Sequence, residues 1–328
     1  MVSTATNTLP NIPQADLNSF HEALKSSKRI LALCGAGLSA ASGLPTFRGA
    51  GGLWRTHDAT QLATPEAFSV DPALVWQFYS YRRHMALKAS PNAAHYALAA
   101  LARNQERDFR TLTQNVDGLS QRSGHPREKL HLLHGTLFDL RCNQYFCKYK
   151  EQDNFTDPIV PALAIPTEED VTSNEARQKN EKQQNGGPRE LDISDESVEL
   201  PELDYRDLPH CPECKKGLLR PGVVWFGEML PQQVINAVDD FITESSKIDI
   251  IMVIGTSAKV YPAAGYVDRA RAKGARVAVV NIDPNDTPGG GMMDGDWFFV
   301  GDAAKIVPEL LRPVVGDIRE ANDTNQRL

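Results

Sequence analysis

The chain has 328 residues, and its 35 Lys and Arg against 42 Asp and Glu give a formal net charge of −7. This acidity argues against a nucleic-acid partner held through bulk positive charge. The longest apolar runs, 250–254 and 277–280, are far shorter than the ~18 residues that a membrane span requires. We therefore expect a globular protein that binds no nucleic acid directly, associates with no membrane and has no transmembrane helix.

The five cysteines are an odd number in a large chain that shows no secretory signal peptide. This usage favours a reducing, intracellular compartment over a disulfide framework. Residues 1–15 contain no Lys or Arg, so they match an organelle transit peptide poorly and indicate no particular compartment. We expect residues 1–18 and 316–328 to form flexible ends.

Short apolar runs alternate with helical patterns along the chain. The predicted strands are 29–34, 109–113, 248–254, 276–282 and 297–300, and the predicted helices are 71–87, 231–244 and 262–273. Such alternation is typical of a parallel sheet with helices on both faces, so the expected fold class is α/β and Rossmann-like. Ligands of these sheets bind at the carboxyl ends of the strands.

A glycine-rich turn follows the first predicted strand, and a helix is expected after it. Residues 35–40 match G-x-G-x-x-A, in which the glycines let backbone N–H groups approach a pyrophosphate. Alone, this pattern fits a ligand-free turn equally well. It also departs from a dehydrogenase fingerprint, because Gly43 and Pro45 interrupt the helix that would continue in such an enzyme.

Further motifs follow the glycine turn in a fixed order: Ser42-Gly43-Leu44-Pro45-Thr46-Phe47-Arg48-Gly49, Thr113-Gln114-Asn115-Val116-Asp117-Gly118-Leu119, His134-Gly135-Thr136-Leu137-Phe138, Pro221-Gly222-Val223-Val224-Trp225-Phe226-Gly227-Glu228 and Gly255-Thr256-Ser257. Together with the glycine turn they resemble the signature of the sirtuins, which are NAD-dependent protein lysine deacylases. The resemblance covers roughly residues 20–315. It implies NAD as cofactor and acyl-lysine proteins as substrates.

The resemblance implies a set of residues that hold NAD. Small polar groups at the ends of successive strands suit ribose hydroxyls, which agrees with this assignment. Phe47 is expected to cover the reactive ribose, and Arg48 to meet phosphate or ribose oxygens. Thr46 stands where many sirtuins have an Asp, so the role of that Asp is not carried over. The implied NAD residues are Gly35, Ala36, Gly37, Ser39, Phe47, Arg48, Gln114, Gly255, Thr256, Ser257, Asn281, Asp283 and Ala303.

Three residues are implied to carry the chemistry. Asn115 and Asp117 follow the predicted strand 109–113, and they resemble the pair that orders the nicotinamide end of NAD. His134 is the expected general base that draws a proton from a ribose hydroxyl, and an ordinary pKa near ~6.5 suits that task. Taken singly, each of the eight histidines fits a structural role, and only His134 lies in the matching motif.

Two cysteine pairs, Cys142-x4-Cys147 and Cys211-x2-Cys214, have metal-ligand spacing. Four thiolates make a closed tetrahedral site, so we expect one structural Zn²⁺, with a redox couple as the alternative. The intervening residues 148–210 contain 16 Asp and Glu against 7 Lys and Arg. We expect a disordered acidic insertion over about 151–207, most clearly at 167–199, within a zinc-binding module spanning 139–218. The NAD-binding domain is then expected to comprise 19–138 and 219–315.

The predicted helix 71–87 places Tyr79 and Arg82 on one face. Alone, such a pair fits a packed Tyr beside a solvated Arg. Tyr-x-x-Arg here resembles the class III sirtuins, which remove succinyl, malonyl and glutaryl groups, and a guanidinium pairs well with a distal carboxylate. Ala63 leaves room for a longer acyl chain, as does Ala67. The β-prone run 223–226, with Val224 and Phe226, is expected to pair with the substrate backbone.

Other functions stay open at this point. A sirtuin of this kind acts mainly as a protein or histone deacetylase, or as an ADP-ribosyltransferase, if the acyl assignment is wrong. A nicotinamide-dependent dehydrogenase and a non-catalytic module that holds NAD and zinc are more distant alternatives. A mitochondrial location follows from the resemblance alone, with cytosol and nucleus open, and no oligomeric state is predicted.

Overall fold

The computed structural model describes residues 12–46, 52–167 and 189–318. The chain divides into two compact units. Unit 1 is Met1–Thr46, Ala89–Gly135 and Met229–Leu328, and unit 2 is Phe47–Lys88 and Thr136–Glu228. The described residues 52–88 therefore pack with the cysteine-containing segment, whereas the sequence analysis placed them with the NAD-binding domain.

Unit 1 contains a six-stranded sheet in the order β11-β10-β9-β1-β4-β5. Every neighbouring pair is parallel, and in the register Ala32 of β1 lies opposite Thr111 of β4 and Met252 of β9. This sheet confirms the predicted Rossmann-like α/β fold. The short strand β5 was not predicted. The strands are β1 Arg29–Cys34, β4 Asp108–Thr113, β5 Leu130–Leu132, β9 Ile250–Ile254, β10 Arg276–Asn281 and β11 Trp297–Val300.

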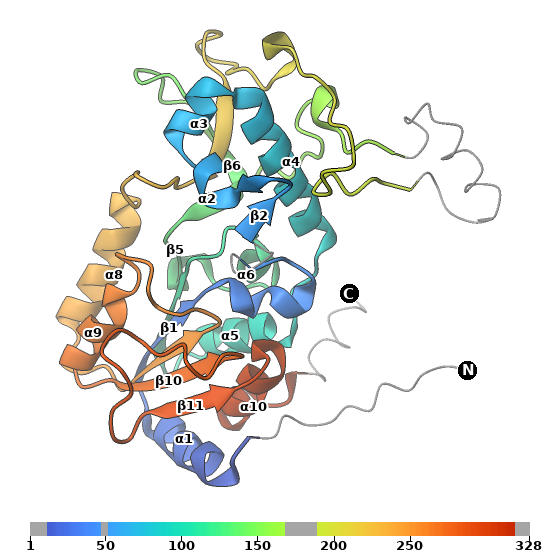
Figure 1. Ribbon diagram of the computed structural model, residues 1–328. Helices are drawn as coiled ribbons and strands as arrows, with labels where there is room; N and C mark the ends of the chain where they lie inside the picture. The colour runs from blue at the N-terminus through green and yellow to red at the C-terminus, as the bar shows by residue number, and fades with distance from the viewer. Residues whose placement is uncertain (1–11, 47–51, 168–188, 319–328) are drawn as a thin grey trace, which may run out of the picture. The chain divides into compact units, whose positions relative to one another are not determined.

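Both faces of the sheet are covered by helices (Figure 1). Ile30 and Ala32 of β1 share a core with α1 (Gln14–Ser26), α5 (Ala93–Arg103) and α10 (Ala303–Val315). Leu31 and Leu33 point to the other face and share a core with α8 (Gln232–Glu244) and α9 (Gly265–Ala272). Alternate residues of β1 are thus buried on opposite faces, which explains its continuous apolar sequence.

The helix expected after β1 is replaced by two 3₁₀ turns, η1 (Ala36–Leu38) and η2 (Ala40–Ser42). Gly43 has a φ of +86° and ends the second turn, and Pro45 follows it. The prediction of a helix was wrong here because these two residues stop it within one turn. Two other short elements of unit 1 are α6 (Leu119–Arg122) and η4 (Arg127–Lys129).

Unit 2 is built on the long helix α4 (Pro72–Lys88) and a small sheet in the order β7-β6-β8. Thr64 and Asp71 accept backbone N–H groups in the first turns of α3 (Pro65–Val70) and α4, at 3.1 and 2.9 Å, which explains where these helices begin. The remaining elements are β2 (Leu53–Trp54), β3 (His57–Asp58), α2 (Ala59–Leu62), β6 (Gly135–Cys142), β7 (Lys150–Glu151), η5 (Pro161–Leu163), η6 (Tyr205–Asp207) and β8 (Leu219–Val223).

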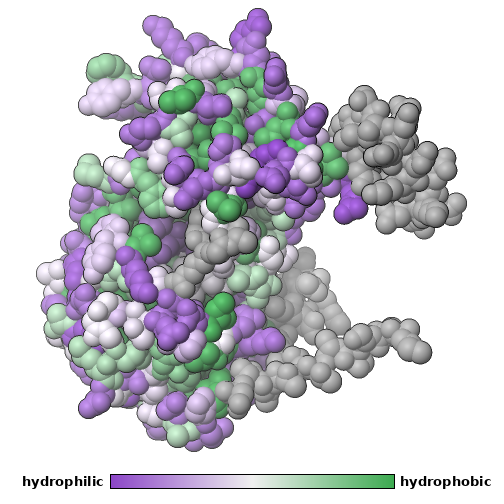
Figure 2. All heavy atoms as spheres, in the orientation of Figure 1, coloured by the Kyte–Doolittle hydropathy of each residue, from purple (hydrophilic) through white to green (hydrophobic). Residues whose placement is uncertain are grey.

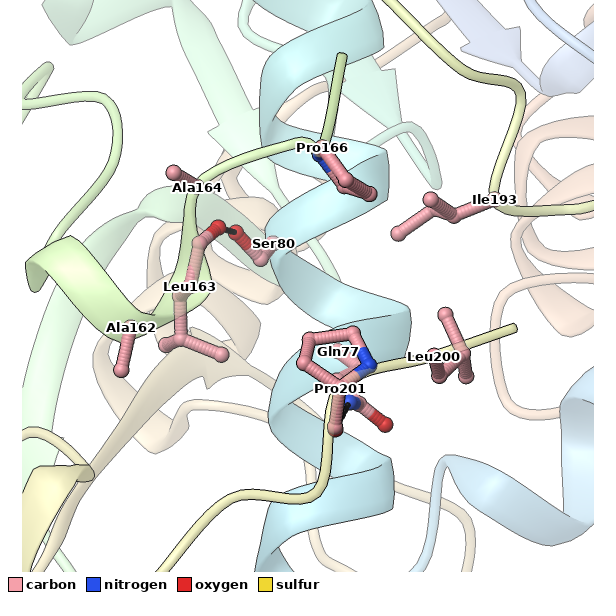
Figure 3. Close-up of a pocket in the computed structure, with 9 residues that line it drawn as sticks. All are labelled: Gln77, Ser80, Ala162, Leu163, Ala164, Pro166, Ile193, Leu200 and Pro201. Atoms are coloured by element: carbon pink, nitrogen blue, oxygen red, sulfur yellow. Dashed lines mark hydrogen bonds between the residues drawn. The ribbon is translucent and has the colours of Figure 1, made fainter. Parts of the chain in front are cut away.

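The described parts of the acidic insertion pack against α4. Leu163 and Ile193 are each 3% exposed, and Ser80 of α4 donates a hydrogen bond to the Leu163 carbonyl at 2.8 Å. Figure 3 shows these side chains around a hollow beside α4. The expectation of disorder therefore fails at both ends of the insertion, since single apolar residues anchor them. Residues 168–188 of the run predicted as disordered lie outside the described residues.

On the face in Figure 2, hydrophilic and hydrophobic residues are interspersed. Within 12–46, 52–167 and 189–318, no helix combines the length and the apolar character needed to cross a membrane.

Candidate active site

The loops after β1 and β9 approach each other closely at the carboxyl ends of the strands. Gly35 N–H donates to the Ile254 carbonyl and Gly37 N–H to the Gly255 carbonyl, both at 2.9 Å. A Cβ added to Gly37 would lie 2.7 Å from the Gly255 Cα, so glycine alone fits. β4 and β5 lie on one side of β1 in the sheet, and β9, β10 and β11 lie on the other. The carboxyl end of β1 is therefore the topological switch point, the position at which open α/β sheets bind ligands.

Ser39, Asn115 and Asp117 form one hydrogen-bond network beside this turn. The Ser39 hydroxyl donates to Asp117 Oδ2 at 2.7 Å, and Leu119 N–H donates to Asp117 Oδ1 at 2.9 Å. Asn115 Nδ2 donates to the Gly35 carbonyl at 3.0 Å and to Ser39 Oγ at 3.3 Å. The predicted residues of the nicotinamide end are thus in contact and held in fixed orientations.

His134 follows β5 and is half-buried. Its Nδ1 lies 3.1 Å from the Gln114 carbonyl, and because a carbonyl only accepts, Nδ1 carries the proton. Nε2 therefore holds the lone pair of the neutral ring. Burial lowers the pKa of His134 from its ordinary 6.5, and this keeps the ring neutral near pH 7. The arrangement suits a general base acting at Nε2.

A buried donor beside His134 lacks a protein partner. Gln114 Nε2 is buried and has no hydrogen-bond partner among the described residues, while its backbone N–H donates to the Cys34 carbonyl at 2.9 Å. Such an orphaned group is costly unless a ligand or water satisfies it. The orphaned amide and the glycine turn together fit a polar dinucleotide such as NAD at this edge.

The residues expected at the adenosine end follow β9, β10 and β11. Asn281 is 6% exposed, and its Nδ2 donates to the Thr256 carbonyl at 3.3 Å, which links two of the loops. Asp283 accepts N–H groups of Asn285 at 2.9 and 3.1 Å within its own turn. Ala303 begins α10 and packs in the core. Ser257 is partly exposed after Thr256. Phe47 and Arg48 lie outside the described residues.

Unit 2 brings the predicted acyl-binding residues of α4 together. Tyr79 is fully buried, and its hydroxyl accepts a hydrogen bond from Trp225 Nε1 at 2.9 Å. Burial raises the pKa of Tyr79, so its hydroxyl stays protonated. The Arg82 guanidinium carbon lies 5.7 Å from the centre of the Tyr79 ring and 5.3 Å from that of Phe78. The two side chains share one face of α4, as the i, i+3 spacing predicted.

The predicted strand 223–226 differs from the observed one, because β8 ends at Val223. Trp225 N–H donates to Glu228 Oε2 and Phe226 N–H to the Ala63 carbonyl, both at 2.9 Å. The Trp225 bond closes the loop on itself and the Phe226 bond ties the loop to the end of α2, so neither N–H is left to pair with a substrate strand. Ala63 is nevertheless in contact with the segment that holds Val224 and Phe226, and the Phe226 side chain is 52% exposed.

Three residues to which the sequence analysis gave no individual role support the site. Trp225 lies against Tyr79, and Glu228 ties its loop to Arg220 and Arg141 through pairs of 2.7 and 2.8 Å. His95, in the first turn of α5, lies 3.4 Å from Ser39 Oγ. Its only sequence signal was Asn92 three positions earlier, the spacing of a helix cap.

The four predicted zinc ligands form one cluster in unit 2. Their Sγ atoms all lie within 4.8 Å of one another, with Cys142 and Cys214 at 3.6 Å and Cys147 and Cys211 at 3.7 Å. A tetrahedral Zn²⁺ with four thiolates separates sulfurs by about 3.8 Å. A Cβ added to Gly217 would lie 2.7 Å from Cys142 Sγ, so the chain closes around the cluster. The donor set and its spacing fit a structural zinc.

Three buried histidines of unit 1 predict acid-sensitive stability. Burial lowers the pKa of His95, His125 and His131 to about 4, from an ordinary 6.5. The unfolded chain therefore binds more protons between these values, and the free energy of unfolding falls as pH drops from 6.5 toward 4. The limiting slope is about 1.4 kcal/mol per pH unit for each histidine.

Urea unfolding at several pH values measures this slope. His131→Phe is expected to reduce the slope by one histidine's share, because it removes one titrating group. Among the described residues His131 Nε2 has no hydrogen-bond partner, so the substitution breaks no bond of that atom. The cysteine cluster is the same in wild type and variant, so its contribution to the pH slope cancels in the comparison. Equal slopes for wild type and His131→Phe would contradict the prediction.

Comparisons with known proteins agree with this geometry. The sequence model of the Sir2 family matches residues 35–262. The chain is 47% identical over 304 residues to an NAD-dependent protein deacylase of Candida albicans, covering 92% of this chain and 99% of that protein. It is 40% identical over 274 residues to the mitochondrial NAD-dependent protein deacylase sirtuin-5 of Xenopus tropicalis, covering 83% and 78%.

Solved structures give the same result. A mutant Sir2 homologue bound to 2′-O-acetyl ADP ribose superposes with a TM-score of 0.68 at 32% identity, covering 94% of this chain and 97% of that one. A Sir2 homologue in complex with NAD has a TM-score of 0.65 at 32% identity, covering 95% and 96%.

Proposed function

The chain belongs to the Sir2 family and is an NAD-dependent protein deacylase, and from this premise we propose that it removes succinyl, malonyl or glutaryl groups from protein lysines. Acetyl groups are then the poorer substrates. One water molecule is consumed to release the lysine amine, and the products are nicotinamide, the free lysine and O-acyl-ADP-ribose.

The pairing of Arg82 with Tyr79 on α4 carries the proposal for acidic acyl groups. A guanidinium and a protonated phenol are both hydrogen-bond donors, and an acyl carboxylate needs donors. The Tyr79 hydroxyl accepts from Trp225, so its own hydrogen remains available for donation. Burial of the Tyr79 ring fixes this hydroxyl, and Arg82 supplies the positive charge that an acetyl group does not require.

The proposed chemistry assigns separate tasks to the residues of unit 1. Bound NAD supplies an ADP-ribosyl group that accepts the acyl oxygen when nicotinamide departs. Asn115 and Asp117 orient the nicotinamide end through the network around Ser39. His134 takes a proton from a ribose hydroxyl at Nε2, while its Nδ1–H bond to the Gln114 carbonyl holds the ring in place. Gly35, Ala36 and Gly37 leave room for the phosphates, and Thr256, Ser257 and Asn281 meet the ribose end.

The direct test compares matched succinyl-, malonyl-, glutaryl- and acetyl-lysine peptides with NAD, with nicotinamide and O-acyl-ADP-ribose measured by mass spectrometry. Acidic acyl peptides are expected to give the higher kcat/KM. Equal or better turnover of the acetyl peptide would reject the acyl assignment and favour a deacetylase. ADP-ribose attached to protein, without O-acyl-ADP-ribose, would indicate ADP-ribosyl transfer.

Arg82→Met tests the residue that the proposal depends on most. Losing a charge-assisted, two-pronged contact is expected to lower kcat/KM for the succinyl peptide about 10- to 100-fold and to spare the weak acetyl activity. Arg206→Met is the matched control, because Arg206 is an exposed arginine of the same unit and should leave both activities unchanged. Unchanged succinyl turnover in Arg82→Met would remove Arg82 from the acyl-binding site.

The relatives named sirtuin-5 are described as mitochondrial, and we extend this location to the chain as part of the proposal. Its partners are protein substrates. Fractionation of cells that express the chain with a C-terminal tag tests the location, and enrichment in the cytosol or nucleus would contradict it.

A further inference from the structure

His95 has a defined tautomer because of its place in α5. Its Nδ1 lies 3.2 Å from the backbone N–H of Asn92, and this N–H can only donate. Nδ1 therefore holds a lone pair, and the proton of the neutral ring is on Nε2. The residue is 1% exposed, and burial keeps the ring neutral.

The Nε2–H of His95 faces Ser39. Nε2 lies 3.4 Å from Ser39 Oγ, and Asn115 Nδ2 lies 3.3 Å from the same oxygen. Two donors thus face one hydroxyl oxygen, which has two lone pairs and a single hydrogen. That hydrogen is left to point at Asp117 Oδ2, 2.7 Å away.

Asp117 is held from both sides as a result. The Ser39 hydroxyl donates to Oδ2, and Leu119 N–H donates to Oδ1 at 2.9 Å, so the carboxylate cannot rotate without losing a bond. We propose that His95 is a positioning residue for deacylation, which acts through Ser39 to orient Asp117 and Asn115 for the nicotinamide end of NAD. This inference rests on the roles of Asn115 and Asp117 in the proposed function.

A purely structural role for His95 makes a different prediction, because its two nitrogens have different partners. Nδ1 serves the cap of α5, whereas Nε2 serves Ser39. In His95→Asn the side-chain oxygen takes the place of Nδ1 and keeps the cap, but nothing reaches Ser39. In His95→Gln the longer amide restores a donor toward Ser39 and gives up the ring acceptor of the cap. The two variants therefore separate the two roles.

The experiment measures the KM for NAD, the inhibition constant of nicotinamide, the KM for the acyl peptide and the melting temperature of both variants. His95→Asn is expected to raise the KM for NAD and the nicotinamide constant about tenfold, with the peptide KM unchanged, and His95→Gln to restore both. An impaired Gln variant beside a normal Asn variant overturns the proposal, as do two normal variants.

If both variants lose stability and activity together, the pair Ser39→Ala and Ser39→Ala/His95→Asn decides. Because His95 acts through the Ser39 hydroxyl, the effect of His95→Asn on the KM for NAD should vanish when that hydroxyl is absent. Additive effects overturn the proposal. These constants are measured with the acyl peptide that the enzyme turns over best, so a failure of the acyl assignment is distinguishable from a failure here.

Discussion

Cys211→Ser is expected to lose bound zinc and to destabilise unit 2 severely. Four thiolates close the site, and the Cys142–Cys214 and Cys147–Cys211 sulfurs are already at contact distances of 3.6 and 3.7 Å. Structural zinc contributes on the order of 10 kcal/mol to folding in small zinc modules, and one lost ligand removes much of it. The cluster also joins Cys142 at the end of β6 to Cys211 and Cys214 beyond the insertion, so its loss removes the link that brings these two segments together.

Metal analysis of the purified chain and thermal unfolding with and without a strong chelator measure the effect. We expect about one zinc per wild-type chain, a large fall in melting temperature with chelator, and neither zinc nor a chelator effect in Cys211→Ser. Cys34→Ala is the matched control, because Cys34 is buried in β1 and burial raises the pKa of its thiol to about 12. It should keep its zinc. A wild-type chain without zinc, or with a disulfide between these cysteines, would favour the redox alternative.

The sheet of unit 1 could be predicted because each long strand has its own local signal. β1 and β9 are apolar on both faces and end in glycine turns, a pattern that few other structures tolerate. β5 has only three residues, and its pairing with β4 depends on contacts distant in sequence, so no periodicity marked it. The helix after β1 was expected by analogy with other nucleotide-binding turns, although Gly43 and Pro45 gave a local reason against it.

The acidic insertion shows why composition is a weak guide to packing. Its charge and polar repeats predicted disorder, and yet Leu163 and Ile193 are buried against α4. Arg55 further donates to the Ile193 carbonyl at 3.2 Å and to the Asp195 carbonyl at 2.9 Å. One buried apolar side chain at each end of the insertion, with a few backbone contacts, leaves no periodic signal in the sequence.

The candidate site was predicted residue by residue only where a motif named it. Asn115, Asp117 and His134 lie in such motifs, and the structure shows their partners. Trp225 belongs to a motif too, but its bond to Tyr79 joins residues 146 positions apart and has no local signature. His95 lies outside every motif considered, and its contact with Ser39 exists only once α5 is folded.

His134→Asn is expected to lower kcat for deacylation about 10²- to 10⁴-fold, the usual contribution of a general base. The shorter amide removes the Nε2 lone pair, while its Nδ2–H takes the place of Nδ1–H toward the Gln114 carbonyl. Because His134 is only half-buried, the melting temperature should change little. His57→Asn is the control, since His57 is exposed on β3 and should leave kcat unchanged.

The pH profile of His134→Asn separates a catalytic role from a structural one. A general base must be unprotonated, so wild-type kcat/KM rises as pH increases through the pKa of His134, which burial places below 6.5. The rate is then flat near pH 7.

In His134→Asn the rise of kcat/KM at acidic pH, the acid limb of the profile, should disappear along with most of the rate. A variant that only loosened the fold would keep this limb at lower activity. An unchanged limb would assign the titration to another group, and near-normal turnover would remove His134 from the chemistry. In His134→Asn with acyl peptide, the rate of nicotinamide release should fall less than the rate of deacylated product formation, because the Asn115 and Asp117 network remains intact.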